Sequence, residues 1–251
     1  MGVASGCVVA IEETRPRFCL RTIDMKRFFT SDHHFGHQNI LKFMSDTRKF
    51  ANTDRMREVL IENWNAAISQ DDEVFVLGDF AYKEREFQNI MPRLNGRKWL
   101  VVGNHDPHFH SRTCPLAGLV LREDPCGLKT VAKGNLLSAA GYLRALGFED
   151  VFLNALIEIT GIGKVMLSHF PYWPTKPEET PAYDLRCEQQ RPLRGDHALL
   201  LHGHVHSKTI AIKADNGLML DIGVDAWGMR PVSEAEIVDL WGKYHEQNSV
   251  S

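Results

Sequence analysis

The organisation of this sequence is clearest over residues 199–206, which read Leu199-Leu200-Leu201-His202-Gly203-His204-Val205-His206. Three consecutive leucines indicate a strand buried on both faces, and histidines follow where that strand would end. The same change from apolar to polar occurs at residues 28–34, 74–79, 100–106 and 165–169. Ligands bind at the carboxyl ends of strands in α/β sheets, so we expect these five polar clusters to meet in space.

Helical patterns separate the apolar runs. Apolar residues share one face of predicted helices at 54–69 and 84–94. Ser233, with Glu236 three residues later, is typical of a capping box at the start of a third helix. Strands that alternate with helices predict an α/β layered domain.

Length and composition favour one globular domain. The chain has 251 residues, and we expect residues 25–251 to form the domain, with residues 1–24 as a tail or extension. Apolar residues make up 43% and charged residues 24%, which excludes a disordered, collagen-like or coiled-coil protein. The net charge of −3 supplies no bulk positive field for long nucleic acid.

Cysteines and apolar runs bear on the cellular location. The five cysteines are scattered and form no CxxC pair, which is typical of reduced thiols. No apolar run approaches the roughly 18 residues that a membrane span needs. No segment has the flanks of a signal peptide. We therefore expect a cytoplasmic protein with no membrane partner.

The polar residues at the strand ends are metal ligands by type. Asp, Asn and His suit Mn, Fe or Zn, and do not make a soft thiolate site. Seven such side chains are too many for one ion and suit two ions about 3.5–4 Å apart that share a carboxylate. Asp-x-His and His-x-His spacing places both side chains on one face where the backbone is extended, with His33 and His202 then directed away. Glycines before Asp79, Asn104 and His204 predict tight turns.

Taken in order, the five blocks resemble the motifs of the calcineurin-like metallophosphoesterases, which are DxH, GDx, GNH with Asp or Glu, a lone His, and GHxH. They stand here as Asp32-His33-His34, Gly78-Asp79-Phe80, Gly103-Asn104-His105-Asp106, His169 and Gly203-His204-Val205-His206. The resemblance spans about residues 27–242 and is closest to a small bacterial and phage branch. It implies a four-layer α/β/β/α sandwich of two mixed sheets, with a dinuclear metal site on one edge.

The resemblance also implies a role for each motif residue. The ligands of the first metal would be Asp32, His34 and His206. Those of the second would be Asn104, His169 and His204, with Asp79 bridging the two ions. His105 would protonate the leaving-group oxygen, and Asp106 would orient His105.

Other segments are candidates for contact with the substrate. His37 lies in a glycine-containing loop just after the first ligands. Segment 171–195 is rich in proline and predicts a lid that offers Tyr183, Asp184 and Arg186 to the substrate, because a guanidinium fits phosphate oxygens. Connection 107–160, with a helical piece near 135–147, is expected to shape the cleft wall or to cap the sheet. His108, His110, His197 and His245 have no motif context, and we expect them at the surface.

The expected activity is hydrolysis of a phosphate ester by metal-bound hydroxide, without a covalent enzyme intermediate. The favoured substrate is a small phosphorylated metabolite or a nucleotide, as a monoester or a diester. One alternative is a nuclease or nucleic-acid end-processing enzyme. Its basic track would use Arg21, Lys26, Arg27, Arg48, Lys49, Arg55 and Arg57. The other alternative is a non-catalytic scaffold with the same fold, against which the complete ligand set argues. Mn is the favoured metal, and Fe, Zn, Ni and Mg suit the same ligands.

Overall fold

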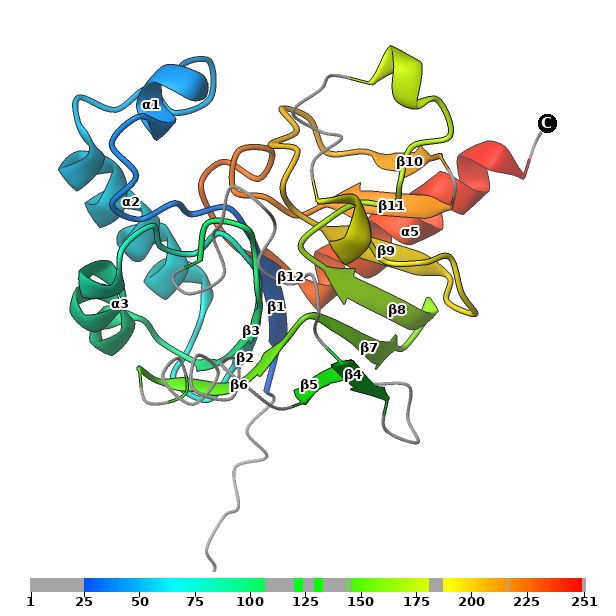
Figure 1. The fold of residues 1–251 in the computed structure, drawn as a ribbon, viewed down its shortest axis with the longest axis horizontal. Coiled ribbons are helices and arrows are strands. Elements are labelled where there is room, and N and C mark those ends of the chain that lie inside the picture. The colour runs from blue at the N-terminus through cyan, green and yellow to red at the C-terminus, as the bar shows by residue number, and fades with distance from the viewer. Residues whose placement is uncertain are drawn as a thin grey trace, which may run out of the picture.

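Two five-stranded mixed sheets stack face to face and helices flank them in the computed structural model (Figure 1). The α/β sandwich of two mixed sheets expected from the sequence is therefore confirmed. The structure describes residues 25–106, 120–123, 129–132, 144, 146–180, 187–215 and 217–249. The predicted tail 1–24 and most of the helical piece near 135–147 lie outside these residues.

The first sheet has the order β12-β1-β2-β3-β6. Its strands are β1 (Arg27–Thr30), β2 (Glu73–Leu77), β3 (Arg97–Val101), β6 (Phe148–Phe152) and β12 (Val232–Ser233). The pairs from β1 to β6 are parallel, whereas β12 runs antiparallel to β1 at the edge. The carboxyl ends of β1, β2 and β3 therefore lie at one edge of this sheet.

The second sheet has the order β10-β11-β9-β8-β7. Its strands are β7 (Asn154–Ile159), β8 (Gly163–Ser168), β9 (Leu199–His202), β10 (Ile212–Ala214) and β11 (Leu218–Asp221). The three central strands β8, β9 and β11 are parallel, and the outer strands β7 and β10 are antiparallel to their neighbours. A separate antiparallel pair consists of β4 (Val120–Glu123) and β5 (Lys129–Ala132).

The described helices are α1 (Ile40–Phe43), α2 (Thr53–Ala67), α3 (Glu84–Ile90) and α5 (Glu234–Asn248), with short 3-10 turns at Met91–Arg93, Pro177–Glu179 and Glu188–Gln190. The predicted helix at 84–94 ends early as an α-helix, because Pro92 cannot donate to the preceding turn and the chain tightens into the 3-10 turn. The predicted capping box is confirmed at the start of α5, where Ser233 and Glu236 bond each other reciprocally.

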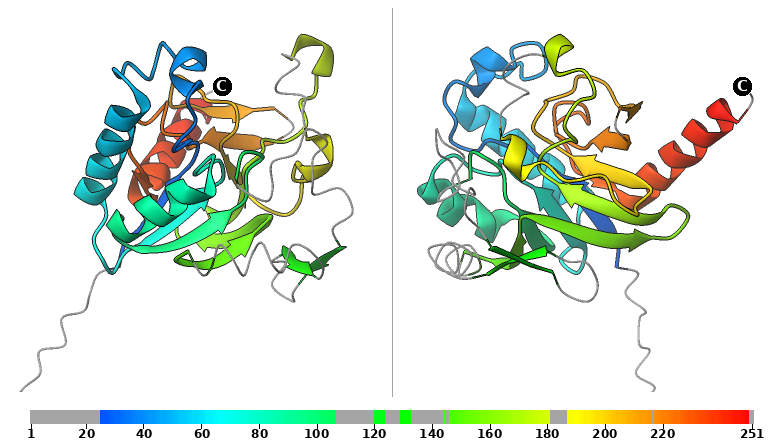
Figure 2. Two further views of the ribbon diagram at one scale, coloured as in Figure 1. Left: turned by 60° about the vertical axis from the view of Figure 1, so that its left-hand side comes forward. Right: turned by 45° about the vertical axis from the view of Figure 1, so that its right-hand side comes forward.

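Two apolar cores explain why the strand segments read as unbroken apolar runs. Phe28 faces α2 and α3, where Trp64 is fully buried, whereas the neighbouring Phe29 faces the second sheet. Both faces of the first sheet are thus covered, so alternation with polar residues is lost. Helices α2 and α3 cover its outer face, and the far end of α5 extends beyond the second sheet (Figure 2). Ile237 of α5 joins the core between the sheets.

Among the described residues, no helix has the length and hydropathy that crossing a membrane requires.

Candidate metal centre

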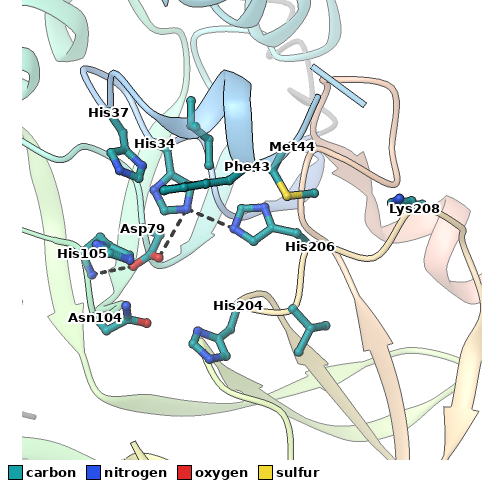
Figure 3. A pocket seen from close by; sticks show the side chains of 12 residues that line it. His34, His37, Phe43, Met44, Asp79, Asn104, His105, His204, His206 and Lys208 are labelled. Atoms are coloured by element: carbon teal, nitrogen blue, oxygen red, sulfur yellow. Dashed lines mark hydrogen bonds and ion pairs between the residues drawn. The ribbon is translucent and has the colours of Figure 1, made fainter. Parts of the chain in front are cut away.

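The loops that follow β1, β2, β3 and β9 line one pocket of about 620 Å³ (Figure 3). Predicted site residues that line it are His34, His37, Asp79, Asn104, His105, His204 and His206. Asp32 and His169 lie beneath them and are fully buried. The structure thus brings together all seven side chains that the motifs mark as ligands.

One group that could hold a metal ion consists of Asp32, His34 and His206. The Nε2 atoms of His34 and His206 lie 3.2 Å apart. Asp32 Oδ1 lies 3.9 Å from His34 Nε2 and 3.8 Å from His206 Nε2. These three donors surround one point, as the ligands of a single ion do.

A second group that could hold a metal ion consists of Asp32, Asp79 and His169. His169 Nε2 lies 3.5 Å from Asp79 Oδ1 and 3.2 Å from Asn104 Oδ1. The His204 ring packs edge-on against the His169 ring, with centroids 5.3 Å apart. Asn104 and His204 therefore adjoin this group, although the three-residue group does not include them.

Asp79 lies between the two groups. Its Oδ2 is 3.4 Å from His34 Nε2, and its Oδ1 is 3.5 Å from His169 Nε2. Each carboxylate oxygen therefore faces a different group. This is the placement that a bridging carboxylate requires.

Hydrogen bonds from the other ring nitrogen orient two of the histidines. His169 Nδ1 donates to the Leu77 carbonyl at 2.8 Å, and His206 Nδ1 pairs with Asp225 Oδ2 at 2.7 Å. With Nδ1 engaged in this way, Nε2 of each ring faces the centre. Metal-binding histidines are held by this kind of outer bond.

The electrostatics of the centre fit a divalent cation. Burial raises the pKa of Asp32 to about 6, and the neighbouring Asp79 carboxylate adds to this effect. Burial also lowers the pKa of His34 well below its usual value, with the neighbouring His206 adding to it, so the ring is neutral as ligation requires. Carboxylates enclosed without solvent need a positive charge, and these oxygen and imidazole donors suit a hard or borderline ion.

The backbone beneath the ligands differs from the expected extended form. Asp32, His34, Asp79, His204 and His206 all have positive φ, between 48° and 72°. Left-handed turns, and not alternation along a strand, therefore bring Asp-x-His and His-x-His side chains to one side. Such a conformation is costly for residues other than glycine, and strain of this kind clusters at functional sites. His33 and His202 are buried away from the pocket, consistent with their expected direction.

The predicted tight turns are confirmed at the motif glycines. A Cβ on Gly103 would lie 2.2 Å from Asp79 Oδ1, and one on Gly203 would lie 2.4 Å from Asp32 Oδ2. A Cβ on Gly78 would lie 2.5 Å from His169 Nδ1, and φ there is +86°. Glycine is therefore required where two ligand loops meet.

His105 and His37 form one wall of the pocket. The His105 ring lies 5.3 Å from the His34 ring and 5.6 Å from the His37 ring, and its backbone N–H donates to Asp79 Oδ1 at 2.8 Å. His37 stacks on Tyr82 with centroids 4.7 Å apart. Both predicted residues therefore face the space above the candidate metal ligands.

Asp106 joins two of the ligand loops. Its carboxylate accepts the backbone N–H groups of Gly103, Asp79 and Phe80 at 2.8, 3.1 and 2.8 Å. These bonds hold the Asp79 loop against the Asn104 loop. The expected orientation of His105 by Asp106 stays a prediction.

Two residues outside the predicted ligand set support the centre. Asp225 bonds His206, and Arg48 bonds Asp225 through Nε at 2.9 Å and Nη2 at 2.6 Å. Arg48 was expected in an exposed basic track, but only 1% of it is exposed. That expectation is wrong, because the guanidinium is enclosed beside the ligand loops. No local pattern distinguishes Arg48 from surface arginines.

The predicted lid falls partly outside the described residues, which exclude Tyr183, Asp184 and Arg186. Among the described residues of 171–195, none lines the pocket. Arg191 donates to the carbonyls of Pro171 and Tyr172. His197 was expected at the surface, but it is buried and bonds the Tyr172 hydroxyl. Its position depends on the packing of this segment against the second sheet, which the local sequence does not reveal.

Replacing Gly103 by alanine tests the close approach of the loops. The added Cβ meets Asp79 Oδ1 and backbone N, so we expect Gly103→Ala to lose bound metal and to melt at a lower temperature. Gly242→Ala is the control, because nothing lies within 4 Å of its Cβ in α5. Metal analysis and thermal unfolding measure both effects. Wild-type metal content in Gly103→Ala would contradict this account of the turn.

Comparison with known proteins finds relatives among phage proteins. No protein-family model matches it. It is 31% identical to the Gene 66 protein of Mycobacterium phage L5 over 234 residues, which are 89% of this chain and 97% of that protein. It is 30% identical to the Gene 66 protein of Mycobacterium phage D29, over 80% of this chain and 88% of that protein. The solved structure of AQ665 from Aquifex aeolicus, a protein of unknown function, is 25% identical, covers 86% of this chain and all of its own, and has a TM-score of 0.58. The chain belongs to the family of the mycobacteriophage Gene 66 proteins.

Proposed function

We propose that this protein hydrolyses phosphate esters with the help of two divalent metal ions. The observation that carries the proposal is the pair of ligand groups joined by Asp32, with Asp79 facing both, at the base of an open pocket. Asp32, His34 and His206 would hold one ion. Asn104, His169 and His204 would hold the other, with Asp79 shared.

Two cations in this arrangement would neutralise the charge of a bound phosphoryl group and lower the pKa of water beside it. The protein supplies the rigid frame for that chemistry. The outer bonds of His169 and His206 fix the ring orientations, and Asp106 fixes the loop that carries Asp79. Such positioning accounts for much of the catalysis of phosphoryl transfer.

His105 is the proposed proton donor to the leaving-group oxygen. Its ring lines the pocket beside His34, and its backbone is tied to Asp79 at 2.8 Å. An imidazole in this position can reach an oxygen on the solvent side of the ligands. Asp106 does not take part in the proton transfer directly, because it bonds the backbone of the loop that carries Asp79.

The pocket favours direct attack by water. Among the described residues that line it, none carries a hydroxyl or thiol group. A covalent enzyme intermediate would require a side-chain nucleophile at the reacting phosphorus, and in this proposal His34, Asp79, His204 and His206 would instead be engaged as metal ligands. This composition supports a single displacement step.

The shape of the pocket favours a small substrate with an organic group. Ile40, Phe43 and Met44 form an apolar wall, and Phe43 is 69% exposed (Figure 3). A large exposed apolar side chain at a polar pocket is suited to contact with the organic part of a ligand. We propose a phosphorylated metabolite or nucleotide, as monoester or diester, and manganese as the favoured metal.

The charges of the expected basic track argue against long nucleic acid as the substrate. Arg48 is buried, while Arg55 pairs with Glu62 at 3.6 Å and Arg57 with Asp54 at 2.9 Å. The cations expected to form a basic track are thus largely engaged by neighbouring carboxylates. This observation favours a small phosphoester over the nuclease alternative.

Metal-dependent turnover is the first test. Metal-stripped protein should not hydrolyse p-nitrophenyl phosphate or bis-p-nitrophenyl phosphate, and added Mn²⁺ should restore hydrolysis of at least one, with two metals bound per chain. Asp79→Asn should lose metal and turnover together, because it removes the charge that faces both groups. Asp72→Asn, another buried carboxylate outside the pocket, should keep both. A wild-type protein that binds no metal would sink the proposal.

His105→Ala separates proton donation from metal binding. We expect it to keep both metals and to slow esters with poor leaving groups more than esters with good ones, because only poor leaving groups need the proton. The slope of log kcat against the leaving-group pKa measures the effect. Equal slowing of all esters would show that His105 is not the acid.

Phe43→Ala tests the apolar wall. Loss of a ring contact worth about 0.5–1.5 kcal/mol should raise KM for an aryl ester about 2- to 12-fold. The KM of a methyl ester and the metal content should stay unchanged. Leu193→Ala is the control, because Leu193 is also exposed but does not line the pocket. An equal rise in KM for both esters would contradict contact with the organic group.

A further inference from the structure

A buried ion pair lies behind the first ligand group. The Arg48 side chain is fully enclosed and donates to both oxygens of Asp225, from Nε at 2.9 Å and from Nη2 at 2.6 Å. The Asp225 side chain is enclosed as well. Thr47 adds a hydroxyl donor to Asp225 Oδ1 at 2.6 Å. This pairing is bidentate, the geometry in which a guanidinium binds a carboxylate best.

The same arginine holds the loop that carries Asp32 and His34. Arg48 Nη2 donates to the Asp32 carbonyl at 2.5 Å, and Nη1 donates to the His33 carbonyl at 3.1 Å. Asp32 and His34 have φ values of 61° and 52° in this loop. Bonds to the two carbonyls hold a backbone conformation that would otherwise relax.

The carboxylate of the pair reaches the third ligand. Asp225 Oδ2 accepts the Nδ1 hydrogen of His206 at 2.7 Å, while Nε2 of that ring lies 3.2 Å from His34 Nε2. The bond selects the tautomer with hydrogen on Nδ1 and fixes the rotation of the ring. Arg48 thus bonds the backbone at Asp32 and next to His34, and Asp225 bonds the ring of His206. The pair therefore reaches all three residues of the group.

We infer that the Arg48–Asp225 pair is a positioning device for the ligand group Asp32, His34 and His206, and that it sets the metal affinity of that group more strongly than that of its neighbour, which shares only Asp32 with it. The inference rests on the proposed function. A buried ion pair is a weak source of stability, because removing two charges from water offsets their attraction. Stability therefore does not explain why the pair is present, whereas its contacts with the ligand loops do.

The matched variant is Asp225→Asn, which keeps the size of the side chain. An amide has one acceptor oxygen, so Arg48 would face an N–H group in either orientation of the amide, together with Thr47 in one and with His206 in the other. In Mn²⁺ titrations of metal-stripped protein we expect one of the two sites to weaken about 10- to 100-fold, the usual effect of losing such an outer partner. The other site, which shares only Asp32 with this group, should lose clearly less affinity. Asp72→Asn, whose carboxylate accepts only backbone N–H groups of Lys26 and Ser69 among its described bonds, should leave both sites unchanged.

A second measurement detects, in metal-free protein, how Asp225 positions the His206 ring. Long-range ¹⁵N NMR of the histidine rings should show His206 of the stripped wild-type protein protonated on Nδ1, and should show a changed tautomer population in Asp225→Asn. Thr47→Val removes the hydroxyl that bonds Asp225 Oδ1 at 2.6 Å and the Met44 carbonyl at 3.4 Å, and it keeps the ion pair. We expect a smaller loss of affinity there, at the same site, so the inference can be tested even where Asp225→Asn folds poorly.

The outcomes separate this inference from the proposed function. Equal weakening of both metal sites with a lower melting temperature would mean that the pair only supports the fold, and would overturn the inference. Unchanged affinity and tautomer would overturn it as well, while two metals on the wild-type protein would leave the proposed function standing. A wild-type protein without metal binding would overturn both.

Discussion

Left-handed backbone at the ligands is the constraint on which the rest of this structure depends. Five of the seven candidate ligand residues have positive φ, and none of the five is glycine. That conformation turns Asp32 and His34, two residues apart, toward the same centre as Asp79. Because each such residue is strained by roughly 1–3 kcal/mol, the surrounding loops must hold every one of them from outside.

Buried hydrogen bonds supply that support. Asp106 joins the loops of Asp79 and Asn104 through three backbone N–H groups. Arg48 holds the carbonyls of Asp32 and His33, and the His204 N–H donates to Asp32 Oδ2 at 3.0 Å. Glycine at positions 78, 103 and 203 lets these loops approach within contact of one another. The centre is therefore a set of interlocked loops, and each loop depends on another.

The sandwich explains why this set forms at one place. Parallel strands β1, β2 and β3 end side by side, and so do β8 and β9 of the second sheet. The core between the sheets, which includes Phe29 and Leu201, fixes the two edges against each other. Metal chemistry at this edge would thus rely on apolar packing far from any polar ligand, because a shift between the sheets would separate His206 from His34.

Much of this protein follows from its sequence. Apolar runs that end in Asp, Asn or His indicate an α/β fold and single out the side chains that meet at the pocket, since each run is a strand with both faces buried. The burial of Arg48 and His197, and the bond from Asp225 to His206, were decided only by the tertiary structure. Arg48 and Asp225 lie 177 residues apart. Their contact depends on the order of the strands and on the stacking of two sheets, and no local pattern of residues encodes a pairing over that distance.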